Sequence, residues 1–211
     1  KGWGSISPST IGYSPELDPL PFDPEKARSL LAEAGYKTPD NPSGKDFGEL
    51  ILNTYVSPGL PLMPESAQLV AEYWNRELGI NAVVRVGDQS ALKKSCRLTE
   101  DCYGQILYRD NETKVDGVGS LRSVYGYRPD RKDIVHDNQE LFDVVSDAMA
   151  VFQPVEREKA LKSAYLRIRD EHYHVQIGYI NLPWGVGPKV LTWEPYPLSF
   201  YPSAIHTITL K

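Results

Sequence analysis

The stretch FDPEKARSLLAEAGY, residues 22–36, contains all the signals of one complete helix. Asp23 is placed to act as its N-cap, because an aspartate carboxylate accepts a hydrogen bond from an unpaired N–H of the first turn. Pro24 follows at a position where its missing N–H costs nothing, and Gly35 can take the left-handed conformation that ends a helix. Alanines and leucines between them repeat at helical spacing. The stretch therefore predicts a short amphipathic helix that docks on a core.

Outside this helix, the chain alternates between strand and helix patterns. Strands are predicted at 49–55, 82–86, 103–108 and 175–180, and helices at 64–78, 90–98, 139–151 and 154–171. The first strand alternates only weakly, as expected of a strand that is covered on both faces. Residues 111–138 are polar and contain several glycines, so we expect a long loop there. The order favours a three-layer α/β fold, with a mostly parallel mixed sheet covered by helices on both faces.

Composition bounds the class of protein. The chain has 211 residues, 41% of them hydrophobic, which is enough for one large domain or two small ones. Its net charge is -5 and its basic residues are scattered, which argues against a nucleic-acid partner. No apolar run approaches the roughly 20 residues of a membrane-spanning helix, and no signal-peptide pattern opens the sequence.

The opening stretch resembles the yDPekAkaLLaeAGy segment of the family 5 extracytoplasmic solute-binding proteins. Members of this family serve ABC importers of peptides, nickel, opines and some sugars. Further stretches resemble the family in the same order: ELILNTYVS, YWNRELGINAVVRVGD, LFDVVSDAMAVFQPVEREKALKSAYLRIRDEHYHVQIGYI and VGPKVLTWEPYP. The resemblance covers nearly the whole chain and implies one lobe of a type II periplasmic binding protein.

The resemblance also implies how the chain is organised and what it binds. Residues 1–22, rich in Pro, Gly and Ser, are expected to form an extended segment near the hinge, and residues 23–211 a single α/β lobe, the second of two. The first lobe and a signal sequence would then lie upstream. The expected partners are a small-molecule or peptide ligand, the ABC permease subunits in the membrane and the missing first lobe. The expected location is the periplasm or cell envelope, with no cofactor and no enzymatic activity.

A ligand is expected beyond the carboxyl ends of the strands, where the loops of an open α/β sheet converge. In peptide-binding relatives, the loop that follows the third predicted strand carries an aromatic residue and an aspartate that pairs with the ligand ammonium. Tyr108 and Asp110 are the nearest matches. Their spacing is shorter than the usual Trp-x-x-Asp, and Asp116-Gly117 replaces an Asp-Pro, so the identity of the ligand stays open.

The full set of predicted ligand-binding residues combines loop aromatics with polar side chains from that loop. Its members are Trp184, Asp110, Tyr108, Arg109, Asn111, Asp116, Tyr55 and Trp193. Solvation of the loop is the alternative role for Asp110, and packing against the chain's own sheet is the alternative for Trp193. The basic residues at 157, 162, 167 and 169 are expected to be solvated on helix faces.

Other chemistry is less well supported. Asp110 and Asp116 can act as acid and base on a glycosidic bond only if their carboxylates are held at a fixed separation. A glycine-rich loop does not favour such a fixed separation, so no catalytic residue is assigned. His172 and His174 offer two metal ligands, but solvated or hydrogen-bonded imidazoles explain them better, and no metal site is predicted. Cys96 and Cys102 leave two possibilities open, a local disulfide or two free thiols.

Two alternative functions therefore remain beside solute import. The first is an interaction module on the same fold, as a chaperone or a receptor. The second is a carboxylate-dependent hydrolase.

Overall fold

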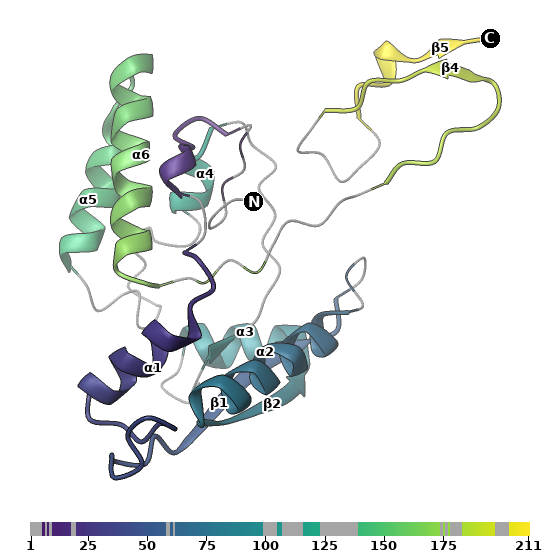
Figure 1. The fold of residues 1–211 in the computed structure, drawn as a ribbon. Helices are drawn as coiled ribbons and strands as arrows, with labels where there is room; N and C mark the ends of the chain where they lie inside the picture. The colour runs from purple at the N-terminus through teal and green to yellow at the C-terminus, as the bar shows by residue number, and fades with distance from the viewer. Residues whose placement is uncertain are drawn as a thin grey trace. The chain divides into compact units, whose positions relative to one another are not determined.

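The computed structural model describes residues 6, 8, 10–17, 20–57, 60, 62–98, 105–106, 116–122, 139–173, 175, 177, 183–196 and 203–211. Contacts divide the chain into two compact units, and Figure 1 labels their α-helices and most of their strands. The sheet unit spans Leu20–Arg109 and Pro129–Asp137, and the helical unit spans Lys1–Pro19, Asp110–Arg128 and Asn138–Lys211. The assignment of 23–211 to one lobe stays a prediction.

The sheet unit is built on three parallel strands in the order β2-β1-β3. These are β1 (Glu49–Tyr55), β2 (Asn81–Gly87) and β3 (Gln105–Ile106). The last four residues of β1, Leu52 to Tyr55, are all buried, because β1 is the central strand and both of its faces are covered. The predicted mixed α/β fold with a parallel sheet is confirmed.

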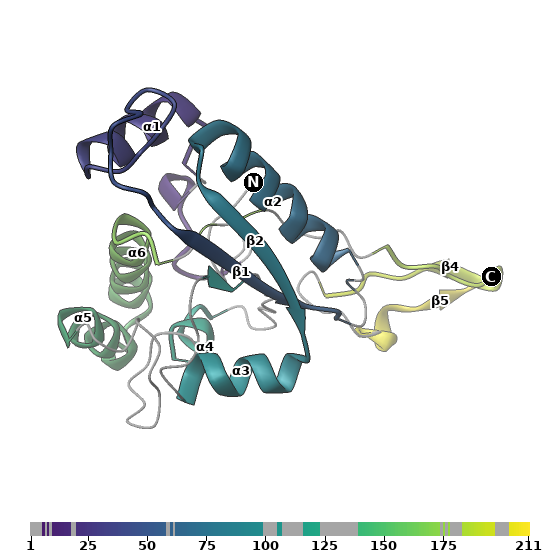
Figure 2. The same ribbon diagram turned by 90° about the horizontal axis from the view of Figure 1, so that it is seen from below.

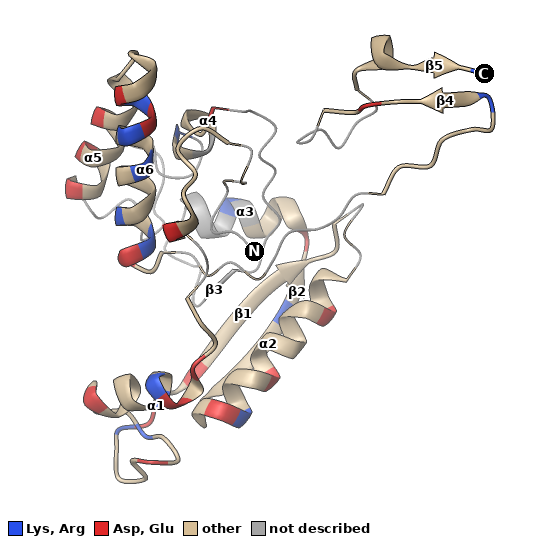
Figure 3. Ribbon diagram, turned by 45° about the horizontal axis from the view of Figure 1, so that its top comes forward, with Lys and Arg blue, Asp and Glu red and all other residues tan. Residues whose placement is uncertain are grey.

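In its described residues, the sheet unit has the helices α1 (Pro24–Glu33), α2 (Met63–Leu78) and α3 (Gln89–Leu98). α2 packs on β1 and β2, whereas α3 contacts β1. Figures 2 and 3 show α2 and α3 on opposite sides of these strands. Between α2 and the sheet lies a core of Ala71, Ile80 and Ala82, against which Trp74 packs. The predicted helical covering of both faces is therefore found around β1.

The ends of α1 and α2 follow their sequence signals. The backbone N–H of Lys26 donates to Oδ1 of Asp23 at 2.9 Å, so Asp23 caps α1 as predicted. Pro24 opens that helix, and Gly79 ends α2 in the left-handed conformation at φ 70°. These ends depend on neighbours within one helical turn.

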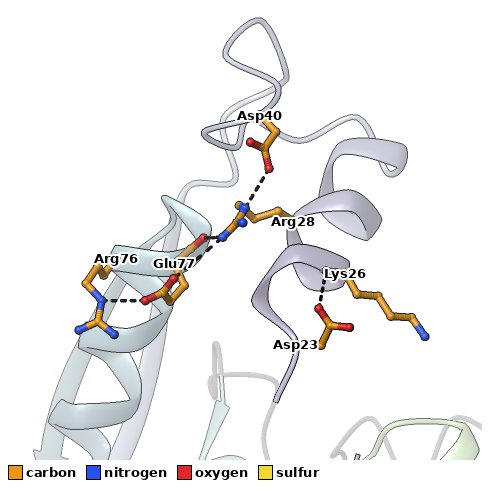
Figure 4. A network of polar contacts seen from close by, with 6 residues as sticks. All are labelled: Asp23, Lys26, Arg28, Asp40, Arg76 and Glu77. Atoms are coloured by element: carbon orange, nitrogen blue, oxygen red, sulfur yellow. Dashed lines mark hydrogen bonds and ion pairs between the residues drawn. The ribbon is translucent and has the colours of Figure 1, made fainter. Parts of the chain in front are cut away.

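A polar network joins α1 to the end of α2 (Figure 4). Nε of Arg28 donates to Asp40 at 2.8 Å, and its Nη1 donates to the backbone carbonyl of Glu77 at 3.2 Å. The Glu77 carboxylate accepts from Nε of Arg76 at 2.8 Å, and this hydrogen bond raises the pKa of Arg76 above its ordinary value. The network fixes how α1 lies against α2.

The helical unit contains the neighbouring helices α5 (Gln139–Ala150) and α6 (Pro154–Asp170), which pack side by side (Figure 1). Its buried side chains come mainly from these two helices: Leu141, Phe142, Val145, Ala148, Leu161, Ala164, Tyr165 and Ile168. The short helix α4 (Val118–Ser120) lies within the predicted long loop. The hydroxyl of Tyr165 on α6 donates to the carbonyl of Gly117, just before α4, at 2.7 Å.

A short 3-10 helix, η1 (Pro15–Leu17), interrupts the stretch for which an extended connection is predicted. The backbone N–H of Leu17 donates to the Ser14 carbonyl at 2.8 Å, and that of Glu16 donates to the Ser14 hydroxyl at 3.4 Å. Leu17 is wholly buried, and η1 contacts α6. Burial of Leu17 therefore anchors η1 in the helical unit.

The C-terminal part of the helical unit forms a small antiparallel ribbon that the sequence patterns did not predict. It pairs β4 (Val190–Thr192) with β5 (Thr209–Leu210), and the 3-10 helix η4 (Ile205–Thr207) precedes β5. The strand predicted at 175–180 lies mostly outside the described residues. In the described part of the chain, no helix combines the length and apolarity that crossing a membrane requires.

Candidate ligand-binding site

The carboxyl edge of the sheet is the first place where a ligand site is expected. Tyr55 ends β1 and lies opposite Gly87, the end of β2, so both strands finish at the same edge. The side chains of Asn53, Thr54 and Ser57 at this edge are buried, and Tyr55 is wholly buried. Polar groups inside a core require partners, and each of these four residues has an interaction within the protein. A contact between Tyr55 and a solute stays a prediction.

The C-terminal segment brings two of the predicted residues together. The rings of Trp184 and Trp193 meet edge to face, with centroids 5.5 Å apart and an interplanar angle of 78°. Nε1 of Trp193 donates to the Ser203 carbonyl at 2.8 Å, which holds that indole in place. Trp184 remains 36% exposed. The pair therefore has one anchored ring and one ring with exposed apolar area, whose contact with a solute stays a prediction.

Side-chain hydroxyls hold the two sides of this segment together. The backbone N–H of Tyr196 donates to Oγ of Ser203 at 3.1 Å, and that of Glu194 donates to Oγ1 of Thr207 at 3.1 Å. The rings of Tyr196 and His206 lie 6.4 Å apart. No sequence pattern predicted these contacts, because partners about ten residues apart in an irregular segment leave no periodic signal.

Asp116 lies in the helical unit, where its carboxylate is engaged by the protein itself. Oδ2 accepts from Nε and Nη2 of Arg157, at 3.1 and 2.6 Å, and Oδ1 accepts from the backbone N–H of Val118 at 3.0 Å. Nη1 of Arg157 donates to the Val151 carbonyl at 2.6 Å. Asp116 thus ties the segment before α4 to the first turn of α6. Its proposed contact with a ligand stays a prediction.

The basic residues at 157, 162, 167 and 169 of α6, which we expected to be solvated on helix faces, form ion pairs. Arg157 pairs with Asp116, Lys162 with Glu16, Arg167 with Glu140 and Glu171, and Arg169 with Asp170. The helical period shows which face such residues occupy, but it does not show which acidic residues of other segments face them.

Several predicted residues lie outside the described part of the chain: Tyr108, Arg109, Asp110, Asn111, Cys102 and His174. Cys96 belongs to α3, and its side chain is likewise outside it. Among the described residues, no group of three or more His, Cys, Asp or Glu side chains is placed to hold a metal ion.

Comparison with protein families gives a match over more than half of the chain. Residues 1–123 match the family described as bacterial extracellular solute-binding proteins, family 5 Middle. Among characterised proteins, heme-binding protein A of Haemophilus influenzae is 33% identical over 72 residues, which cover 28% of this chain and 13% of that protein.

Solved structures show the same fold. An oligopeptide-binding protein of Borrelia burgdorferi superposes with a TM-score of 0.61 at 23% identity, covering 77% of this chain and 30% of that one. The oligopeptide-binding protein AppA of Bacillus subtilis, in complex with a nonapeptide, gives 0.60 at 19% identity, covering 81% and 35%. A nickel ABC transporter structure from Bacillus halodurans gives 0.57 at 18% identity, covering 76% and 33%. The chain thus spans about a third of each of these proteins.

Proposed function

The chain belongs to family 5 of the bacterial extracellular solute-binding proteins, and on this premise we propose that it is one lobe of the substrate-binding component of an ABC importer. The match over residues 1–123, more than half of the 211 residues, is the observation that carries the proposal. In the proposed mechanism, two lobes close around a small solute, an oligopeptide or a similar molecule, and deliver it to a membrane permease. The proposed location is outside the cytoplasm, and the proposal assigns no catalytic residue.

The exposed indole of Trp184 supports a role in solute binding. Trp193 supports this ring from the side, and the hydrogen bond to Ser203 holds Trp193 in turn. A fixed aromatic surface binds apolar or planar parts of a solute with little loss of side-chain freedom. We therefore place Trp184 first among the proposed ligand contacts.

The C-terminal ribbon supports the need for a partner lobe. Leu191 and Leu210 of the ribbon, and Val186 and Ile205 in the segments that lead into its strands, are all more than half exposed. A two-stranded ribbon is marginally stable in water unless another strand or layer covers it. Because the chain spans about a third of the matched structures, we propose that the missing first lobe supplies this cover.

Closure of the two lobes also has a thermodynamic requirement. A solute drives it only by binding the closed form better than the open one. Contacts from both lobes supply that difference, so we expect one lobe alone to bind weakly.

The test compares the full-length protein with the 211-residue chain. Mass spectrometry identifies the solute that co-purifies with the full-length protein, and calorimetry then measures its affinity for both. We expect a Kd of about 1 µM or tighter for the full-length protein, and binding at least about 100-fold weaker for the chain alone. Submicromolar binding by the chain alone would contradict a shared cleft. Failure of the full-length protein to bind any co-purified solute would contradict import.

A further inference from the structure

The outward face of α2 carries a row of exposed apolar side chains. Leu62, just before the helix, and Leu69 and Tyr73 within it share one face and are 63%, 56% and 46% exposed. Phe22, 78% exposed, extends the row, because its ring meets that of Tyr73 edge to face with centroids 6.3 Å apart. The guanidinium of Arg76 lies over the ring of Tyr73, 4.8 Å from its centroid. We call Leu62, Leu69, Tyr73 and Phe22 the α2 row.

Two carboxylates flank this row. Glu65 and Glu72 lie one turn on either side of Leu69, and both are exposed. Among the described residues, no ion pair or hydrogen bond engages either of their side chains. Arg76 is the only basic residue of α2, and its Nε donates to the Glu77 carboxylate at 2.8 Å. Figure 3 shows acidic positions along α2 and a basic one near one of its ends. The flank of the row therefore has negative charge available for a partner.

The support beneath the row is preformed. Phe22 directly precedes the cap residue of α1, and Arg28 joins α1 to Asp40 and to the end of α2 (Figure 4). Tyr73 is held between Phe22 and Arg76. A surface whose side chains are already positioned loses less freedom when a partner binds.

We propose that the α2 row docks a protein segment that presents apolar side chains flanked by lysine or arginine. Contact with the row removes exposed apolar surface from water, and the two glutamates attract and orient the basic flank. The same glutamates repel an anionic membrane surface, so a peptide segment fits better than a lipid bilayer. The inference uses only the sheet unit and does not depend on solute binding.

The probe is a fluorescent amphipathic peptide of about 18 residues with leucines on one face and lysines on the other, long enough for about five helical turns. A matched peptide carries glutamates in place of the lysines. Fluorescence anisotropy at low and physiological salt measures the affinity of each for the 211-residue chain. We expect only the lysine peptide to bind, and Leu69→Ser to weaken it at least about tenfold. Reversing both glutamates, Glu65→Lys with Glu72→Lys, should shift the preference to the glutamate peptide.

Matched control variants lie on α6, on the other unit of the chain. Val155→Ser removes an apolar side chain that is 72% exposed, more than Leu69, and Glu156→Lys with Glu158→Lys reverses two exposed charges. Both should change the affinity by less than about twofold. If they weaken binding as much as the α2 variants do, the net charge of the chain attracts the peptide and the proposal is wrong. Circular dichroism melts confirm that each variant folds.

Two further results would assign the α2 row to another occupant. If the 211-residue chain binds the lysine peptide and the full-length protein does not, the rest of the protein covers the row. If binding to phosphatidylglycerol vesicles depends on Leu69, the row faces a membrane. Either result overturns the proposed protein segment, whereas retention of peptide binding by the full-length protein supports it.

Discussion

Arg157 donates two hydrogen bonds to a single carboxylate oxygen of Asp116, at 3.1 Å from Nε and 2.6 Å from Nη2. A third donor, Nη1, serves the Val151 carbonyl at 2.6 Å. The Arg157 side chain is only 18% exposed, so water replaces few of these bonds when they are lost. An aspartate expected from the sequence to face a ligand therefore also holds the helical unit together.

Arg157→Ala should lower the free energy of unfolding by about 2 kcal/mol, because it leaves a partly buried carbonyl and a carboxylate without their donor. Water reaches the half-exposed Asp116 and limits the loss. Urea denaturation measures the change. Arg85→Ala is the control, since its pair with Glu49 is exposed and its removal should cost less than about 1 kcal/mol. Equal losses would show that Arg157 is no more than a surface ion pair.

Substitutions at Gly12 and Gly35 distinguish the stability cost of backbone strain from that of a steric clash. Both have left-handed backbones, with φ of 92° and 85°. A Cβ on Gly12 would lie 2.6 Å from Cβ of Leu161, whereas a Cβ on Gly35 would meet nothing within 4 Å. We expect Gly35→Ala to cost about 1 kcal/mol and Gly12→Ala about 2 to 4 kcal/mol. Thermal melts of the two variants test this order, which equal melting temperatures would contradict.

The side-chain amide of Asn75 on α2 pairs with both backbone groups of Ala82 in β2. Nδ2 donates to the Ala82 carbonyl at 3.0 Å, and the Ala82 N–H donates to Oδ1 at 2.6 Å. Asn75→Ala should cost about 1 to 2 kcal/mol and speed hydrogen exchange at the Ala82 amide, since Ala82 is buried. Gln68→Ala, on an exposed position of the same helix, should cost less than about 0.5 kcal/mol. Unchanged exchange at Ala82 in Asn75→Ala would refute the pairing.

Trp184→Ala in the full-length protein should weaken solute binding about tenfold, because the exposed indole is lost from the proposed site. Its effect on thermal stability should be smaller than that of Trp193→Ala, which also removes the hydrogen bond to Ser203. Calorimetry measures the affinity and a thermal melt the stability. A stability loss without a change in affinity would make Trp184 structural. This prediction rests on the proposed function.

Signals confined to one turn or one strand were sufficient to predict much of the fold. Asp23 and Pro24 predicted the start of α1, because caps depend on neighbours a few residues away. The weak alternation of β1 predicted a strand covered on both faces, and β1 is the central strand of a parallel sheet. The C-terminal ribbon escaped prediction, because its strands are short and mostly exposed and thus have no burial pattern.

The amino-acid sequence by itself determined the family, the alternation of helices and strands and the ends of the first two helices. Only the tertiary structure showed that Arg157 meets Asp116, 41 residues away, and that Trp184 rests against Trp193. The physical reason is one of range. Capping and hydrophobic periodicity act over a few residues, whereas a salt bridge or a ring contact requires the chain to bring distant segments together.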